Sequence, residues 1–163
     1  MKKLILIRHA KSSWKIAELE DSWRPLSSRG YRQLASLTPH IPHSGLWLVS
    51  PAVRTYATAH VLRRLAGLPM GGIWLDDRLY ESSGHKLMVL LHGLDDVDDD
   101  VTLIGHSPGL DELTQLLCHE HRQPFGTADL VALELDIGSW RDTRANCGRV
   151  TLHLVPGNDE AEA

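Results

Sequence analysis

Apolar runs of four or five residues alternate along the first two thirds of the chain with segments whose apolar residues recur at helical spacing. The strand-like runs are Lys3–Ile7, Leu46–Val49, Gly72–Leu75 and Val101–Ile104. The helical segments are Ser28–Thr38, Pro51–Ala66, His85–Leu91 and Gly109–His119. Because a strand, a helix and a second strand fold into a right-handed βαβ unit, this alternation predicts a mainly parallel sheet covered by helices.

The last third of the chain carries a different pattern. Two strand-like runs, Asp129–Ile137 and Arg149–Val155, are separated by turn-forming residues at 138–142 and a glycine at 148. With no helix between them, the two runs are expected to pair as an antiparallel hairpin at the sheet edge. The predicted fold class is therefore α/β, a three-layer α/β/α arrangement with a mostly parallel sheet and an antiparallel edge hairpin near the C-terminus.

Length and charge fit one globular domain in a reducing compartment. We expect a single domain over residues 1–157 of the 163, followed by a frayed acidic tail at 158–163. The formal net charge of −4 disfavours nucleic acid and anionic membranes as partners. No apolar run is long enough to span a membrane, and the opening run is too short for a signal peptide. Cys118 and Cys147 lack CxxC spacing, which favours a cytoplasmic location.

Charged and titratable side chains stand at the carboxyl ends of three predicted strands. Arg8 and His9 follow the first strand, Arg54 comes shortly after the second, and His106 follows the fourth. In open α/β sheets, ligands bind at this end of the strands. Two guanidiniums suit phosphoryl oxygens, one imidazole can act as a nucleophile, and the other can donate hydrogen bonds to developing charge. The four residues predict a phosphoryl-transfer site without a metal or other cofactor.

The start of the second predicted helix also points to an anion. Ser50 is a natural N-cap, and Pro51 suits the first helical position. Arg54 would then lie at the end of the first turn, where the helix dipole disfavours a cation. This misfit predicts that Arg54 helps to hold an anion, which the free N–H groups of the helix also attract.

Four segments resemble, in chain order, the motifs of one enzyme family. They are Leu6–Ala10, Asp21–Gly30, Ser50–Thr55 and Ile104–Gly109. Together they resemble the histidine phosphatase superfamily of phosphoglycerate-mutase-like proteins, and within it the small SixA-type phosphohistidine phosphatases. A single segment is weak evidence, whereas four in family order and in the expected strand context form a specific match.

The resemblance assigns roles position by position. It makes His9 the nucleophile that becomes phosphorylated, and it has Arg8, Arg54 and His106 bind the phosphoryl oxygens. It offers Glu81, after the third strand, as the general acid. It implies metal-independent hydrolysis of phosphohistidine in a phosphorylated protein or of a small phosphate ester. Few inserted loops separate Arg54 from His106, so the site should be open, which suits a protein substrate.

Several positions depart from the family pattern or have a second interpretation. Alanine stands at position 10 in place of a glycine, which ordinary backbone angles would tolerate. Lys11, Ser12 and Ser13 can contribute charge or hydroxyl contacts where the family's asparagine has no match. Asp21 and Arg24 are interpreted as a salt-bridged loop that positions the first helix, and Arg24 is also a candidate for the site.

Two other functions stay open on the sequence. Residues 105–109 also match the GxSxG nucleophile elbow between a strand and a helix. Ser107 could therefore be the nucleophile of a serine esterase, with His119, His121 or His153 downstream. In the phosphatase interpretation Ser107 instead offers its N–H or hydroxyl group to the phosphate. The third possibility is a phosphate- or phosphoprotein-binding module without turnover.

Neither the remaining histidines nor the acidic run predicts a metal site. The histidines lack the convergent spacing of zinc ligands. The stretch Asp95–Asp100 lacks the glycine and the terminal glutamate of a calcium loop. We therefore expect a solvated loop before a strand.

Overall fold

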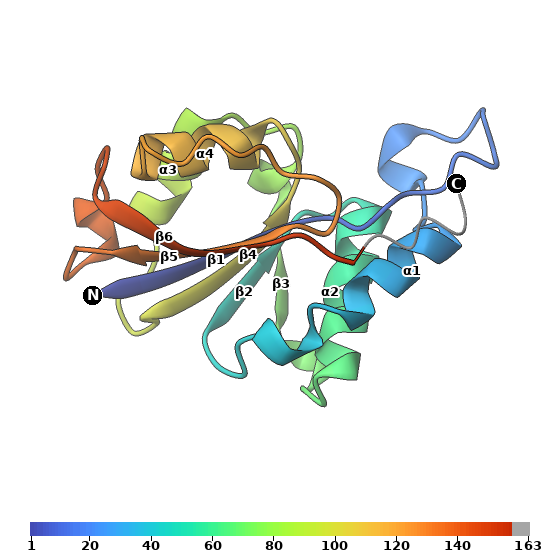
Figure 1. The fold of residues 1–163 in the computed structure, drawn as a ribbon, viewed down its shortest axis with the longest axis horizontal. Coiled ribbons are helices and arrows are strands. Elements are labelled where there is room, and N and C mark those ends of the chain that lie inside the picture. Colours follow the sequence, from blue (N-terminus) through green and yellow to red (C-terminus); the bar gives the residue numbers. More distant parts are fainter. Residues whose placement is uncertain (158–163) are drawn as a thin grey trace.

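A six-stranded sheet in the order β3-β2-β4-β1-β5-β6 forms the centre of the molecule (Figure 1). The computed structural model describes residues 1–157, so the tail predicted at 158–163 lies outside the described residues. The strands are β1 (Lys2–Arg8), β2 (Leu46–Val49), β3 (Ile73–Leu75), β4 (Asp100–Gly105), β5 (Leu130–Leu135) and β6 (Gly148–Leu154). The first four strands run parallel, while β5 pairs antiparallel with both β1 and β6. The predicted fold class is confirmed.

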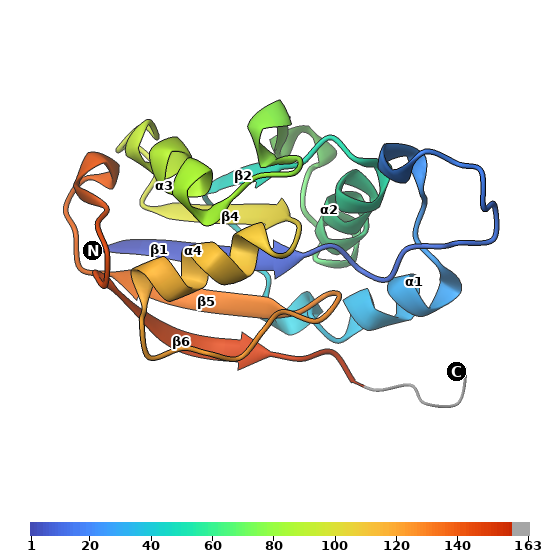
Figure 2. The same cartoon turned by 90° about the horizontal axis from the view of Figure 1, so that it is seen from above.

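Four α-helices cover the two faces of this sheet. They are α1 (Ser28–Ala35), α2 (Val53–Leu65), α3 (Gly84–His92) and α4 (Gly109–Leu117). Figures 1 and 2 show α3 and α4 over one face, with α1 and α2 on the other. Short 3-10 helices form at Asp21–Trp23, Thr38–His40, Met70–Gly72, Asp77–Leu79 and Trp140–Asp142. The arrangement has the three layers that the sequence predicts.

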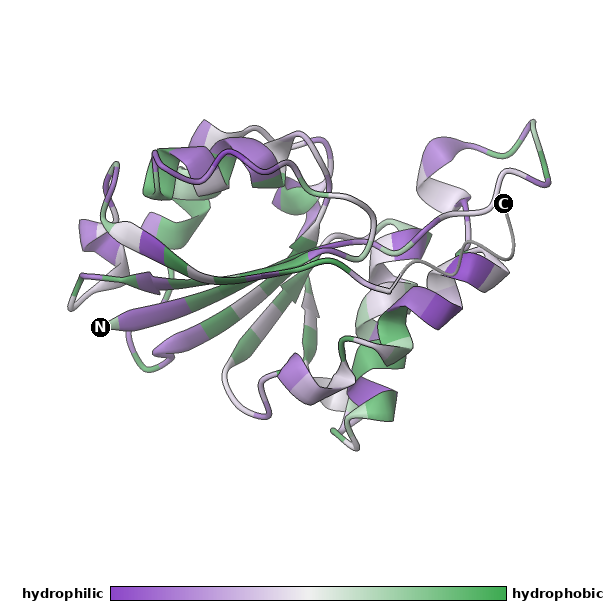
Figure 3. Ribbon diagram, in the orientation of Figure 1, coloured by the Kyte–Doolittle hydropathy of each residue, from purple (hydrophilic) through white to green (hydrophobic). Residues whose placement is uncertain are grey.

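Two apolar cores lie between the sheet and its helices. Leu4 and Leu6 of β1 pack into the core beneath α3 and α4, whereas Ile7 packs into the core beneath α1 and α2. Neighbouring strand residues point to opposite faces, so β1 is buried on both sides and is almost continuously apolar. The hydropathy colouring of Figure 3 shows this apolar centre of the sheet. Burial of each such leucine or isoleucine side chain stabilises the folded state by about 1.5–3 kcal/mol relative to exposure to water.

The predicted strands lie close to the observed ones, but several helix ends differ. The first helix ends at Ala35 instead of Thr38, because Pro39 follows and the chain turns into a 3-10 helix. The second begins at Val53, and its N-cap position is Ala52, which offers no capping side chain. The prediction that Ser50 caps this helix is therefore wrong.

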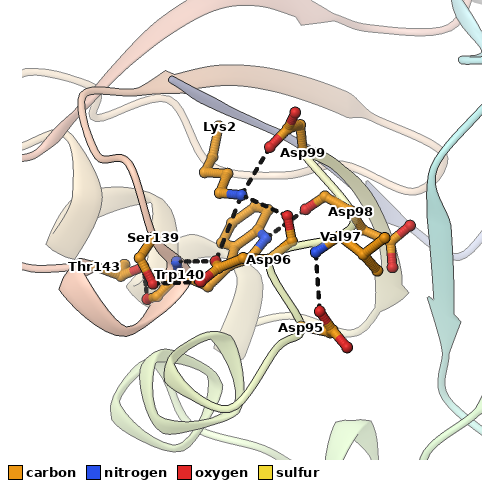
Figure 4. Close-up of polar contacts among 9 residues, drawn as sticks. All are labelled: Lys2, Asp95, Asp96, Val97, Asp98, Asp99, Ser139, Trp140 and Thr143. Atoms are coloured by element: carbon orange, nitrogen blue, oxygen red, sulfur yellow. Dashed lines mark hydrogen bonds and ion pairs between the residues drawn. The ribbon is translucent and has the colours of Figure 1, made fainter.

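The acidic stretch before β4 is mainly exposed, as predicted, but the carboxylates of Asp96 and Asp99 have partners outside the stretch. The Lys2 side chain is only 2% exposed, and its Nζ lies 2.8 Å from Asp99 Oδ1 and 3.5 Å from Asp96 Oδ1 (Figure 4). Asp96 also accepts hydrogen bonds from the Ser139 hydroxyl and the Trp140 N–H. The stretch thus ties the start of β1 to the loop between β5 and β6.

Candidate active site

The carboxyl ends of the central strands bring three of the predicted residues together. His9 follows β1 and His106 follows β4, and these two strands are neighbours in the sheet. The centroids of the two imidazole rings lie 5.4 Å apart. Arg54, in the first turn of α2, places its Nη2 3.3 Å from His106 Nδ1. The adjacent pocket of about 450 Å3 is lined by Arg54, His106, Ser107 and Glu81, among others.

His9 is held with its proton on one ring nitrogen. Its side chain is 7% exposed, and Nδ1 lies 2.8 Å from the carbonyl oxygen of Ala10. A carbonyl oxygen only accepts hydrogen bonds, so Nδ1 carries the proton and Nε2 keeps its lone pair. Burial lowers the pKa of His9 to about 4, and the positive charges of Arg54 and Arg8 act in the same direction. The imidazole is therefore neutral at pH 7.

His106 is oriented by contacts at both ring nitrogens. Its Nδ1 faces Arg54 Nη2, and its Nε2 lies 2.7 Å from the hydroxyl oxygen of the fully buried Ser50. A guanidinium nitrogen only donates, so Nδ1 accepts and Nε2–H donates to Ser50. Burial, Arg54 and His9 lower the pKa of His106 to about 3. Ser50 thus serves this imidazole instead of the helix, which explains why it does not cap α2.

Asp21 lies in the site, which differs from its predicted role in a loop beside Arg24. Its Oδ2 accepts hydrogen bonds from Arg54 Nη2 and from the Tyr80 hydroxyl, each at 2.9 Å. The Arg54 Nη1 donates to the backbone carbonyl of Asp21 at 2.7 Å. Burial by itself would raise the pKa of Asp21, but the hydrogen bonds from Tyr80 and Arg54 outweigh it and keep the pKa below its usual range. Asp21 and Tyr80 are therefore two residues of the pocket whose roles sequence reasoning missed.

Two buried donors at the ends of β1 and β4 have no hydrogen-bond partner within residues 1–157. They are Arg8 Nε and Ser107 Oγ. The other end of the Arg8 guanidinium is engaged, because Nη1 donates to the carbonyl of Phe125 at 2.8 Å. Burial lowers the pKa of Arg8, although the group stays charged at neutral pH. Unsatisfied buried donors are uncommon. Ser107 lines the pocket, where its hydroxyl can meet an anion, whereas Arg8 is not among the residues that line it.

Glu81 lines the same pocket in an unusual backbone conformation. Its φ is +53°, in the left-handed region that side chains other than asparagine and aspartate rarely adopt. Such strain persists where the surrounding structure imposes it, and it is concentrated at functional sites. Glu81, which is predicted to be the general acid, thus combines a position in the pocket lining with a strained backbone.

The positions around the first motif have mainly structural contacts. Ala10 is buried with a negative φ, and its N–H donates to Thr58 Oγ1 at 3.0 Å, so alanine is tolerated here. Arg24 is buried and donates from both Nη atoms to the carbonyls of Ile16 and Ala17, at 3.0 Å each. Lys11 and Ser12 line a separate hollow and are not among the residues that line the active-site pocket.

The contacts of Ser107 do not include a base. No described residue forms a hydrogen bond with its hydroxyl. Two of the histidines proposed as esterase partners instead bind each other, with His121 Nε2 2.9 Å from His153 Nδ1. His153 Nε2 then lies 2.8 Å from Asp129 Oδ2. A serine nucleophile needs an adjacent base, so these contacts weigh against the esterase.

Neither a metal centre nor a membrane span is found in the part of the chain that the structure describes. No group of three or more histidine, cysteine, aspartate or glutamate side chains there could hold a metal ion. None of the helices within residues 1–157 has both the length and the apolar character to cross a membrane.

Comparison with known proteins identifies the family. The sequence model of the histidine phosphatase superfamily (branch 1) matches residues 4–88, and the chain belongs to this superfamily. A comparison with curated protein sequences finds no significant match.

Solved structures with this fold include proteins assigned as the phosphohistidine phosphatase SixA. The one from Nakamurella multipartitia has a TM-score of 0.80 at 19% identity, covering 96% of this chain and 97% of that chain. The one from Agrobacterium tumefaciens has a TM-score of 0.75 at 21% identity, covering 96% and 99%. The protein histidine phosphatase SixA complexed with tungstate has a TM-score of 0.77 at 22% identity, covering 94% and 97%. These similarities establish a shared fold.

Proposed function

We propose that the protein is a metal-independent phosphatase that acts through a phosphohistidine at His9. Its substrates would be phosphohistidine in a phosphorylated protein or a small phosphate monoester. The observation that carries this proposal is the neutral His9 imidazole, whose proton is fixed on Nδ1 while Arg54 and His106 lie beside it. Membership of the superfamily and the fold shared with SixA phosphatases support it.

In the first step, the lone pair of His9 Nε2 attacks phosphorus and the bond to the leaving group breaks. Arg54 stabilises the charge on the phosphoryl oxygens, and its orientation is maintained by Asp21. The unpaired Nε–H of Arg8 provides a further donor. This division of labour suits phosphoryl transfer, in which catalysis is mostly positioning and electrostatic stabilisation.

His106 would change protonation state when the substrate binds. Its Nδ1 accepts a hydrogen bond from Arg54 and therefore cannot donate to a phosphoryl oxygen. A bound dianion raises the pKa of a neighbouring imidazole, so His106 takes up a proton from solvent at Nδ1. Its contact with Arg54 Nη2 then breaks, and both groups donate to phosphoryl oxygens. The bond from Nε2–H to Ser50 keeps the ring in place during this change.

The second step hydrolyses the phosphoenzyme. Glu81 gives a proton to the leaving group in the first step and takes one from water in the second. Water attacks phosphorus, the bond to His9 Nε2 breaks, and inorganic phosphate leaves. Imidazole is a better leaving group than an alkoxide, so a phosphohistidine substrate depends less on proton donation by Glu81.

Turnover of p-nitrophenyl phosphate by the purified chain tests this proposal. We expect His9→Ala to lower kcat by at least about 10³-fold, whereas Ser107→Ala leaves the mechanism intact. Incubation with 32P-labelled substrate should place acid-labile label on His9. Hydrolysis of p-nitrophenyl acetate that depends on Ser107 would support the esterase instead. Turnover of neither substrate, together with tight phosphate binding, would indicate a binding module.

A further inference from the structure

A second hollow, of about 440 Å3, lies where the loop after His9 meets the start of α1. Its lining contains four basic residues, Lys11, Lys15, Arg29 and Arg32, and among the described residues it contains no carboxylate. Lys11, Lys15 and Arg29 are exposed and form no ion pair within residues 1–157. This concentration of positive charge is local, because the whole chain has a formal net charge of −4.

Large apolar side chains accompany these charges. Trp14 is 62% exposed and Ile16 is 59% exposed. Both belong to the loop between β1 and α1, which projects from the body of the molecule in Figures 1 and 3. Tryptophan and arginine are the residues most enriched at the centres of protein interfaces. We call Lys11, Trp14, Lys15, Ile16 and Arg29 together the loop surface.

Buried contacts hold the loop surface in one conformation. The Arg24 guanidinium stacks on the Trp14 ring, 3.6 Å from its centroid, and donates to the carbonyls of Ile16 and Ala17. The backbone of the loop is tied down as well, because Ser13 N donates to the carbonyl of Pro25 at 2.8 Å. A surface ordered in advance loses little conformational entropy when it binds a partner. The buried Arg24 therefore stabilises the conformation of the loop surface.

The loop surface begins two residues after His9, close to the candidate active site along the chain. Lys11 follows His9 by two residues, so the two Cα atoms are at most about 7.6 Å apart. Further along the same loop, Asp21 contacts Arg54 in the pocket. A macromolecule that inserts a phosphorylated side chain into the pocket would therefore lie against the loop surface, which a small phosphate ester would not reach.

We propose that the loop surface docks a partner protein whose phosphorylated side chain is surrounded by carboxylates. The inference rests on the proposed function and adds to it the place and the charge of the partner's contact. Opposite charges would steer the partner and favour the correct orientation, while Trp14 and Ile16 would supply apolar contact. The neighbouring pocket is proposed to take a phosphorylated side chain, so the occupant of the loop surface is the protein that carries this side chain and not an anionic membrane.

Two peptides of equal length test this surface, each with a central phosphohistidine, one flanked by Asp and Glu and the other by Ser and Gly. We expect the protein to show about a 10-fold higher kcat/KM for the acidic peptide at low salt, and this preference should shrink as salt is added. The double variant Lys15→Glu/Arg29→Glu should lose the preference through a higher KM. It should retain its turnover of p-nitrophenyl phosphate. Arg29 lies in the first turn of α1, where glutamate suits the helix dipole, so the variant should fold.

The matched control is Arg141→Glu/Arg144→Glu, which makes the same change of charge in the loop between β5 and β6, far from the loop surface (Figure 1). It should keep the preference. An equal effect of both double variants, or equal turnover of both peptides by the unmodified protein, would overturn the docking proposal while p-nitrophenyl phosphate turnover still supports the phosphatase. Calorimetry with the unphosphorylated acidic peptide tests docking even if no turnover is seen. Binding to phosphatidylserine vesicles, but to neither peptide, would assign the surface to a membrane.

Discussion

At the scale of single residues, the proton positions in the site follow from atoms that can only donate or only accept. The Ala10 carbonyl keeps the His9 proton on Nδ1, and Arg54 makes His106 Nδ1 an acceptor. Ser50 completes the set as the acceptor for His106 Nε2–H. Three neighbours thus set the tautomers of both histidines before any substrate binds.

Loss of the Ser50 hydroxyl should therefore impair chemistry more than folding. We expect Ser50→Ala to lower kcat about 10- to 100-fold, because His106 loses the partner that fixes its ring and tautomer. The 15N chemical shifts of His106 should change toward a mixture of tautomers. The control is Thr55→Ala, which removes a hydroxyl that is equally buried but bonded to the carbonyls of Ser50 and Ala52. It should cost about 1 kcal/mol of stability with little change in kcat. Equal kcat losses in both variants would contradict the role given to Ser50.

The depressed pKa values of the two histidines should make stability depend on pH. In the unfolded chain both titrate near 6.5, whereas in the folded protein the pKa is about 4 for His9 and about 3 for His106. Below pH 6.5 the unfolded state therefore binds more protons than the folded state. The free energy of unfolding decreases as the pH is lowered from 6.5 towards the folded-state pKa values. Urea unfolding should show a lower free energy of unfolding at pH 5 than at pH 7. This difference should be about 1–2 kcal/mol smaller in His106→Asn than in the unmodified protein. The same decrease in both proteins would show that His106 is not buried in its neutral form.

At the scale of elements, the start of α1 and the loop after His9 are fitted to each other. Ser27 Oγ donates to the carbonyl of Lys11 at 3.0 Å and accepts from Gly30 N at 3.1 Å, which caps the helix. A Cβ atom at Gly30 would collide with the same Lys11 carbonyl. The glycine that ends the Asp21–Gly30 segment thus has a physical basis in this close approach.

Gly30→Ala should push this loop away from α1. Because the contact is with backbone, we expect a loss of about 1–3 kcal/mol in the free energy of unfolding. Activity should fall as well, since the loop leads directly from His9. Gly71→Ala, whose Cβ would meet nothing within 4 Å, serves as the control and should unfold at nearly the same urea concentration as the unmodified protein. A Gly30→Ala protein as stable as this control would show that the loop yields easily.

Element ends show where local patterns are insufficient. The strands could be predicted to within a few residues because buried parallel strands are short apolar runs with polar ends. The sequence predicts that α2 begins at Pro51, because Ser50 has the local signature of an N-cap, whereas the helix begins at Val53. Its hydroxyl is instead bound to His106, a residue on another strand end. A tertiary partner displaced the local role.

At the scale of the whole molecule, strand order decides which residues meet. β1 lies between β4 and β5, and β2 lies on the other side of β4. The ends of β1, β2 and β4 therefore share one edge of the sheet, where His9, Arg54 and His106 converge. At the amino end of β1, Lys2 pairs with Asp99 (Figure 4), so the two ends of this strand carry different groups of charged residues.

The amino-acid pattern alone is enough to predict the fold class and to place Arg8, His9, Arg54 and His106 at strand ends, because hydrophobic period and strand-end polarity are local properties. Tertiary structure alone decided the proton positions and the partners of these residues. Asp21 reaches Arg54 across 33 positions, Tyr80 reaches Asp21 across 59, and Ser50 reaches His106 across 56. No local pattern encodes such contacts, because they exist only once the sheet has placed its strand ends side by side.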